Sequence, residues 1–204
     1  MRREMPRPAL HGTDVLLDAA RDLVIETGPR AVGIRDIAKR SGAPSGSLYH
    51  RFQSRDKLVA LAWLRAARRF QTGFVAALGT DDPFDAIRAS MRWSVGFALS
   101  EPADTQLLLC FSQGELLDAA PPPETAAELA VVNVSVENAV RTLTRRLFRT
   151  VTSRAVEVTT YAVIDLPYAV LRRHLLAGTL IPRASALLES AAIAIVTDSM
   201  QVRR

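Results

Sequence analysis

The sequence predicts an all-α protein in two parts, a unit of short helices followed by a larger bundle of long helices. Apolar residues recur at helical spacing through nearly all of the 204 residues, and no stretch shows the alternation that is typical of a strand. A hydrophobic content of 49% is enough for a real core. The composition changes near residue 55, where the short helices of a basic segment give way to the long helices of a nearly neutral one.

The basic charge is concentrated in the first third of the chain. The formal net charge is +5; residues 1–60 hold 11 basic and 7 acidic side chains, whereas residues 61–204 hold 15 and 14. A local excess of cationic side chains attracts anionic partners. The distribution therefore predicts that the N-terminal segment contacts an anion.

The cysteine, histidine and hydropathy patterns exclude several classes of protein. The single Cys110 forms no intramolecular disulfide, and with the scattered His11, His50 and His174 it offers no metal-ligand spacing, so no metal site is expected. No stretch reaches about 18 apolar residues without a charge, and the basic N-terminus precedes no long apolar segment. We expect a cytoplasmic protein with no contact with a membrane.

The first 55 residues are predicted to hold a basic arm and three helices. Residues 1–11 form the flexible arm, and residues 12–55 form a compact domain. Thr13 and Asp14 are predicted to cap the first helix, which Gly28-Pro29 stops.

The second and third helices of this domain are short. The second is predicted over residues 34–40, and Pro44 opens the third, which continues through about Arg51. Leu48 and Phe52 of the third helix are expected to face the core.

Residues 56–204 are predicted to form the helical bundle. Ser54 is a candidate N-cap for a helix that reaches about Leu78, and Asp82-Pro83 begins the next one. Three further helical stretches are predicted over residues 125–149, 154–177 and 184–200. Pro167 lies inside the second of these and predicts a kink or break. The last is apolar over so much of its surface that it needs partners on more than one side, from the same chain or from a second copy.

Residues 34–52 carry the pattern of a helix-turn-helix motif. Two short helices are joined by a turn that contains Gly42, an arrangement in which the second helix can lie in the DNA major groove. The predicted exposed face of that helix offers hydroxyl groups, an imidazole and a guanidinium, which can contact base edges or phosphates. Its residues are Ser45, Gly46, Ser47, Tyr49, His50 and Arg51.

This segment resembles the DNA-binding domain of TetR-family transcriptional regulators. The resemblance rests on three stretches and covers roughly residues 12–62. The stretches are Ile34-Arg-Asp-Ile-Ala-x-x-Ser-Gly42, Ser45-Gly-Ser-Leu-Tyr-His-Arg-Phe52 and Ser54-Arg-Asp-Lys-Leu58. It implies base readout near the starts of the second and third helices and phosphate contacts nearby. The implied DNA-contacting residues are Arg35, Pro44, Ser45, Gly46, Ser47, Tyr49, His50, Arg51 and Arg55.

Two positions depart from the family pattern. Gly33 replaces a frequent threonine that helps to cap the second helix and contacts phosphate, and Pro44 replaces a usual serine. The rest of the chain matches the family only as a helical bundle of suitable length, which in the family is a ligand-binding and dimerisation domain.

Large side chains of the bundle predict either a plain core or a ligand pocket. Aromatic and methionine residues at helical spacing are more often core, but in a regulator of this kind they can line an apolar pocket. The candidate pocket residues are Trp63, Met91, Trp93, Phe97, Phe111, Asn133 and Tyr161. Cys110, in an apolar run, is interpreted as an inert buried thiol. No cofactor is expected, and the ligand would be a small apolar or amphipathic effector.

Taken together, these features predict a repressor that binds an inverted-repeat site on double-stranded DNA as a homodimer and responds to a small effector. The dimer is expected to form through the helices at about 154–177 and 184–200. The alternative is a helical small-molecule binding protein without operator recognition. An enzyme is not expected, since no set of nucleophile, base and orienting residue and no glycine-rich phosphate loop occurs.

Overall fold

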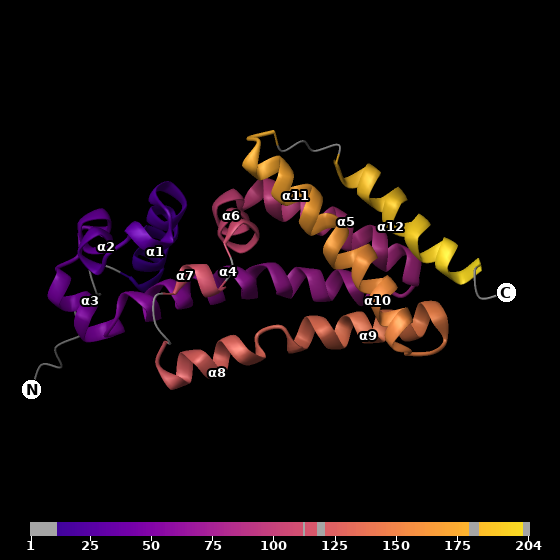
Figure 1. The fold of residues 1–204 in the computed structure, drawn as a ribbon, viewed down its shortest axis with the longest axis horizontal. Helices are drawn as coiled ribbons and strands as arrows, with labels where there is room; N and C mark the ends of the chain where they lie inside the picture. Colours follow the sequence, from indigo (N-terminus) through magenta and orange to yellow (C-terminus); the bar gives the residue numbers. More distant parts are fainter. Residues whose placement is uncertain (1–11, 112, 118–120, 180–183, 202–204) are drawn as a thin grey trace, which may run out of the picture.

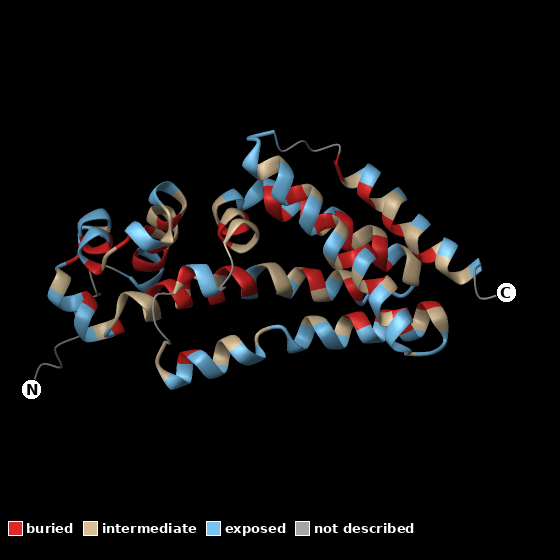
Figure 2. Ribbon diagram, viewed as in Figure 1, coloured by how far each residue is buried: buried red, intermediate tan, exposed pale blue. Residues whose placement is uncertain are grey.

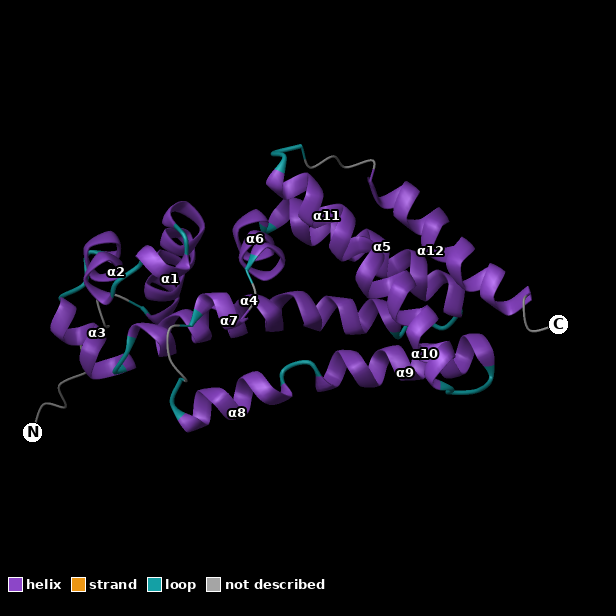
Figure 3. Cartoon of the chain, viewed as in Figure 1, coloured by secondary structure: helices purple, strands orange, loops and turns teal. Residues whose placement is uncertain are grey.

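A computed structural model of the chain describes residues 12–111, 113–117, 121–179 and 184–201. Over these ranges the regular structure consists of helices, without a strand (Figure 3). The small helices α1, α2 and α3 gather at one end of the molecule, and the long helix α4 runs from them through the bundle (Figure 1). The all-α, two-part prediction is confirmed.

The N-terminal unit contains α1 (Thr13–Thr27), a 3-10 turn η1 (Pro29–Ala31), α2 (Ile34–Ser41) and α3 (Ser45–Phe52). α1 begins after Gly12 without a side-chain cap, so the predicted capping by Thr13 and Asp14 is wrong. Both lie inside the first turn, where the Asp14 carboxylate still favours the positive end of the helix dipole. Gly28, with a φ of 86°, ends α1 as predicted.

The two long helices begin where the sequence predicts, and each start has a side-chain cap. The Ser54 hydroxyl accepts a 3.1 Å hydrogen bond from the Lys57 backbone N–H at the start of α4 (Arg55–Leu78). Asp82 accepts two 2.9 Å bonds from backbone N–H groups at the start of α5 (Pro83–Ser100). These caps fix where each helix starts, because they satisfy donors that have no partner within the helix.

The middle of the chain is more divided than predicted. α6 (Pro102–Cys110) and α7 (Gln113–Leu116) follow α5, and the single helix expected at 125–149 is two helices, α8 (Pro123–Val131) and α9 (Val134–Phe148). The interruption falls at Val132 and Asn133, and asparagine is a weak helix former. The Asn133 side-chain oxygen accepts a 2.9 Å hydrogen bond from Gln71 of α4, which ties the interruption to the bundle.

The last part of the chain holds α10 (Ser153–Thr160), a π-helical turn (Tyr161–Asp165), α11 (Leu166–Leu176) and α12 (Ala184–Gln201). The predicted distortion at Pro167 takes the form of this π turn, which widens the helix just before the proline. The Leu166 N–H donates to the Tyr161 carbonyl, five residues back. Helical structure therefore continues through Pro167 without a break.

Two hydrophobic cores hold the molecule together (Figure 2). The first joins α1, α2 and α3 to the start of α4, and it also takes Leu107 from α6 and Leu116 from α7. The second lies among α4, α5, α9, the π turn, α11 and α12. Packing of the N-terminal unit thus extends past residue 55. Among the described residues, none of the helices has the length and apolar character needed to cross a bilayer.

Candidate DNA-binding surface and bundle cavity

The third helix presents a polar face because its two large apolar residues point inward. Leu48 and Phe52 are buried in the first core, four residues apart on one side of α3. Ser47 and His50 are exposed, Tyr49 is 50% exposed, and Ser45 is partly buried at the first helical position. The side of α3 that faces away from Leu48 and Phe52 therefore carries hydroxyl and imidazole groups that are available to a partner.

A defined turn holds α3 against α2. Gly42 adopts the left-handed conformation, with a φ of 69°, and the Ala43 N–H donates to the Ala38 carbonyl at 3.1 Å. The Asp36 carboxylate accepts a 2.9 Å bond from the Gly33 N–H and thus closes the start of α2, although Gly33 has no side chain with which to cap it. These contacts fix the angle between the two short helices.

Gly46 has no packing reason to be glycine. A Cβ atom built at this position meets nothing within 4 Å, and a glycine inside a helix costs about 1 kcal/mol relative to alanine. The position lies on the exposed face, beside Ser45 and Ser47. The missing side chain leaves space for an external surface to approach the helix backbone closely.

The three arginines expected to contact DNA differ in their surroundings. Arg35 is exposed at the start of α2, whereas Arg51 and Arg55 bond to other parts of the protein. Arg51 donates a 2.7 Å hydrogen bond to the Thr13 hydroxyl and lies over the Phe52 ring at 5.2 Å, so it joins α3 to α1. Pro44, the N-cap of α3, is exposed.

Arg55 serves the interior of the protein. Its side chain is only 11% exposed, and its guanidinium donates to the backbone carbonyls of Pro29, Val32 and Leu116, as well as to the Asp56 carboxylate. Two separate segments, the one from Pro29 to Val32 and the end of α7, are thereby held against the start of α4. The resemblance placed a phosphate contact here, whereas the geometry gives Arg55 a structural role.

A cavity of about 470 Å³ lies in the bundle. Its walls are mainly apolar, and they come from helices far apart in the sequence: α4, α5, α6, α9, α10, the π turn and α11. The lining residues include Trp63, Phe70, Phe74, Phe97, Leu108, Val140, Val163 and Leu171. The size falls within the range of small-molecule sites.

Three of the seven predicted pocket residues line this cavity, namely Trp63, Phe97 and Asn133. The other four lie elsewhere. Met91 is fully buried in the second core, and Trp93 donates its indole N–H to the Phe70 carbonyl at 2.9 Å while its ring packs on Gly73.

Phe111 and Tyr161 also lie away from the lining, for different reasons. Phe111 packs against the first core at the end of α6. Tyr161 is exposed and donates a 2.8 Å hydrogen bond to Glu157, one turn earlier on the same helix. Helical spacing alone does not distinguish these positions, because it does not show which neighbouring helix each face meets.

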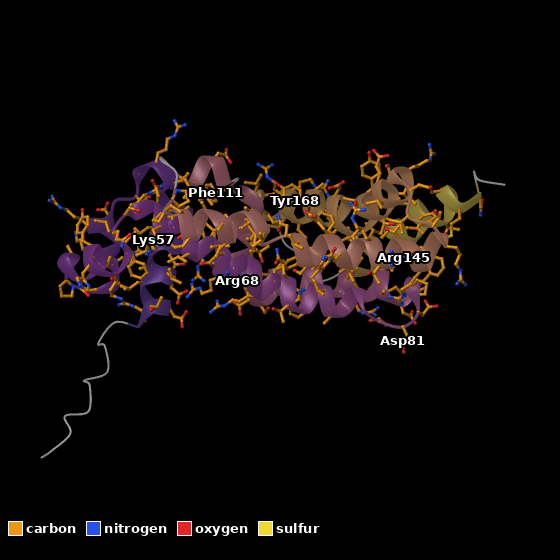
Figure 4. All side chains as sticks on the ribbon, turned by 90° about the horizontal axis from the view of Figure 1, so that it is seen from below. Lys57, Arg68, Asp81, Phe111, Arg145 and Tyr168 are labelled. Carbon is orange, nitrogen blue, oxygen red and sulfur yellow. The ribbon has the colours of Figure 1, made fainter. Side chains whose placement is uncertain are left out.

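The cavity carries a few polar groups among its apolar walls. Gln71 and Asn133 are hydrogen-bonded to each other, and Tyr168 donates to the Leu109 carbonyl at 3.3 Å. Glu137 and Arg141 of α9 add two opposite charges to the lining. Figure 4 shows Tyr168 near the middle of the molecule, well away from Arg145 at the end of α9. The site suits a largely apolar molecule with some polar character.

Sequence reasoning missed the wall formed by α10, the π turn and α11. Its lining residues are Val156, Thr160, Val163, Ile164, Pro167, Tyr168 and Leu171. Pro167 was the available signal, because a proline inside a helical pattern marks a local distortion of the kind found at functional sites.

The comparisons with known proteins agree with this architecture. The sequence profile of the bacterial regulatory proteins of the tetR family matches residues 16–62. A transcriptional repressor of Mycobacterium tuberculosis is 43% identical over 58 residues, which is 28% of this chain and 31% of that protein. The repressor KstR2 of Rhodococcus jostii is 52% identical over 44 residues, 22% of each protein. The chain thus spans about a third or less of the length of these curated relatives.

Solved structures resemble the chain over nearly its whole length. A TetR-like transcriptional regulator from Rhodococcus sp. RHA1 superposes with a TM-score of 0.69 at 21% identity, covering 93% of this chain and 96% of that one. The fatty acid degradation regulator FadR from Bacillus halodurans gives 0.70 at 14% identity, covering 91% and 98%. At these identities the likeness concerns the fold.

A helix-turn-helix unit joined to a helical bundle defines a class of transcriptional regulators, and this chain has both parts in that order. Residues 16–62 carry the sequence profile of the tetR family of bacterial regulatory proteins, and the fold of the whole chain resembles that of solved TetR-like regulators.

Proposed function

We propose that the protein is a cytoplasmic, effector-responsive transcriptional repressor that binds an inverted-repeat DNA site as a homodimer. The observation that carries the proposal is the polar face of α3, where Ser47, Tyr49 and His50 are exposed opposite a fully buried Leu48. The tetR-family match covers this helix, and the relatives that share it are named as repressors.

The DNA-contacting residues of the proposal fall into two groups. Arg35 and the start of α3, from Pro44 to Ser47, read base edges, because the first residues of a recognition helix approach the groove most closely. Tyr49, His50 and Arg51 contact phosphates. Arg55 acts indirectly, since its bonds hold the unit on α4.

A second copy of the chain completes the proposed site. One recognition helix contacts too few base pairs to be selective, so two helices related by twofold symmetry would read two half-sites. Exposed apolar side chains on the last two helices support a homodimer there: Leu176 at the end of α11 is 63% exposed, and Leu187 of α12 is 77% exposed. Sedimentation of the Leu187→Glu variant tests this, and an unchanged mass would contradict the proposed contact.

The DNA-binding part is tested by gel shift with the DNA upstream of the protein's own gene. We expect binding to a palindromic fragment that weakens as salt rises. Replacing Tyr49 by alanine should weaken binding about tenfold or more while the dimer stays folded, because it removes a phosphate contact. Absence of salt-dependent binding to any palindromic fragment would contradict the proposal and favour the alternative, a helical binding protein without operator recognition.

A matched pair of arginine variants separates a local contact from the effect of net charge. Arg35→Gln and Arg145→Gln remove the same charge from two exposed side chains. Lys57 lies next to the DNA-binding unit, and Arg145 lies toward the opposite end of the molecule (Figure 4). We expect only Arg35→Gln to weaken binding about tenfold, in line with the loss of one good base contact.

The effector part is tested with tryptophan fluorescence. In the Trp93→Phe variant the remaining Trp63 lines the cavity and reports on its occupant. We expect saturable energy transfer from Trp63 to the fluorescent amphipath anilinonaphthalene sulfonate. Equal transfer in a variant whose cavity is filled by Ala67→Phe would contradict binding in the cavity.

A further inference from the structure

A buried carboxylate connects the DNA-binding unit to the wall of the cavity. Asp104 of α6 is 1% exposed, and its two oxygens take separate partners. One accepts a 2.6 Å hydrogen bond from Arg21 of α1, and the other accepts a 3.1 Å bond from Arg69 of α4. A charge so deeply buried is tolerated only while it stays paired.

Arg21 is firmly held on its own side of this contact. Its side chain is largely buried and also contacts the Asp22 and Asp18 carboxylates of α1, at 2.9 and 3.3 Å. Burial lowers the pKa of Arg21, but the hydrogen bonds that its guanidinium donates to Asp104 and Asp22 outweigh that effect and the pKa is raised overall, so the side chain stays charged. The guanidinium is therefore a fixed positive charge beside the Asp104 carboxylate.

The same helix forms part of the cavity wall. Thr105, the residue after Asp104, lines the cavity together with Leu108 and Leu109, while Leu107 is buried in the first core. α6 lies between α1 and α11 (Figure 1) and packs against both. One side of this short helix thus belongs to the cavity, and another side belongs to the DNA-binding unit.

Two side chains belong to both places. Trp63 of α4 and Leu108 of α6 line the cavity and also pack against the first core. The Trp63 indole nitrogen is buried without a hydrogen-bond partner in this arrangement. A buried donor without a protein partner is an unsatisfied polar group, and this one lies where the cavity meets the first core.

We infer that Asp104 is the positioning residue through which occupancy of the cavity acts on the DNA-binding unit. An occupant that displaces Thr105 and Leu108 also moves the Asp104 carboxylate. Because separation from Arg21 would leave one oxygen of this buried carboxylate without its charged donor, α1 follows α6, and the orientation of α3 changes with it. The inference rests on the proposed function, since it assumes that the cavity binds an effector.

Hydrogen–deuterium exchange of the full chain tests the inference without an operator or a natural effector. Anilinonaphthalene sulfonate serves as the probe for the cavity. In the unaltered chain we expect the probe to slow exchange in α9 and α11 and to change exchange in α1 by about fivefold or more, the lower range of allosteric couplings. In Asp104→Asn the protection of α9 and α11 should remain, and the response of α1 should fall below about twofold.

A second variant and a matched control keep the test decisive. Arg21→Gln removes the partner on α1 and leaves the Asp104–Arg69 pair, so it should abolish the same response even where Asp104→Asn fails to fold. Asp18→Asn makes the same chemical change beside the same arginine but does not touch α6, so the response of α1 should survive.

The outcomes separate the coupling from the proposed function. A response of α1 that persists in Asp104→Asn and Arg21→Gln overturns the inference, as does its equal loss in Asp18→Asn. Absence of protection in α9 and α11 of the unaltered chain contradicts the cavity part of the proposed function and overturns the inference with it. A coupled response in a chain that binds no palindromic DNA supports the inference and contradicts only operator binding.

Discussion

The two cores of the molecule differ in how they use their volume. In the first, Leu16, Ile37 and Leu48 have no exposed surface, and none of the core's buried members lines the cavity. The second surrounds about 470 Å³ of space, with several of its largest side chains on the wall. The contrast shows that one chain can combine a tightly packed unit with a hollow bundle by distributing its packing unevenly. Under the proposed function, the packed unit recognises DNA and the hollow bundle senses the effector.

The largest expected effect comes from truncating a leucine in the rigid core. Leu48→Ala should lower the free energy of unfolding by about 3 kcal/mol, because it opens a new cavity behind α3. Leu109→Ala should cost about 1 kcal/mol, since this residue is half-buried and the space it leaves joins a cavity that already exists. Urea unfolding of both variants measures the difference, and equal losses would break the comparison.

Filling space rather than removing it sharpens the same comparison. Ala38 in the first core and Ala67 on the cavity wall are both 3% exposed. Ala38→Phe should cost about 2 kcal/mol, since a packed core has no room for the ring. Ala67→Phe should cost less than about 1 kcal/mol, because the ring enters open space, and it should abolish binding of the fluorescent probe. Thermal melts measure the two losses of stability, and titrations measure binding of the probe. A larger loss in Ala67→Phe than in Ala38→Phe would contradict open space beside Ala67.

A smaller effect distinguishes the two kinds of arginine in the DNA-binding unit. Arg55→Gln should lower stability by about 1 to 2 kcal/mol, because several buried carbonyls lose their donor. Arg35→Gln should change stability by less than about 0.5 kcal/mol, as is usual for an exposed side chain. Unfolding curves and gel shifts of both variants distinguish a structural arginine from one that contacts DNA. An Arg55→Gln protein of unchanged stability but weak DNA binding would indicate that Arg55 contacts phosphate.

The smallest effect concerns Cys110, where α6 ends between the two cores. Burial raises the pKa of its thiol, and the nearby Arg172 guanidinium lowers it by less. A raised pKa means less thiolate at neutral pH, so a disulfide reagent should react more slowly with the folded protein than with the unfolded chain. The rate should rise with pH. A folded-state rate equal to that of the unfolded chain would contradict an inert thiol.

The DNA-binding unit was the more predictable part because its signals are local. Gly28 and Gly42 mark helix ends, Ser54 caps α4, and Leu48 and Phe52 define the inner face of α3 by their spacing alone. Arg55 is the exception. Its role depends on carbonyls 23, 26 and 61 residues away, which no local pattern indicates.

The cavity was less predictable because its walls meet only in three dimensions. Trp63, Phe97 and Asn133 were identified, but Trp93 and Met91 share the same helical periodicity and face elsewhere. Which face of α5 meets the cavity depends on how α4 and α9 pack against it. The hydrogen bond from Trp93 to Phe70 and the close contact with Gly73 are such details of packing.

The π turn at Tyr161–Asp165 has a consequence for how this protein can diverge. A π turn holds one more residue than the α-helical turn it replaces, and the helix on either side keeps its direction. Val156 before the turn and Leu171 after it both remain on the cavity wall. Deleting a single residue here would restore a uniform helix and narrow the wall, whereas a deletion inside α9 would rotate the rest of that helix by about 100°. The segment is thus a place where chain length can vary by one residue and change the shape of the cavity, while the helix-turn-helix unit at the other end of α4 stays unchanged.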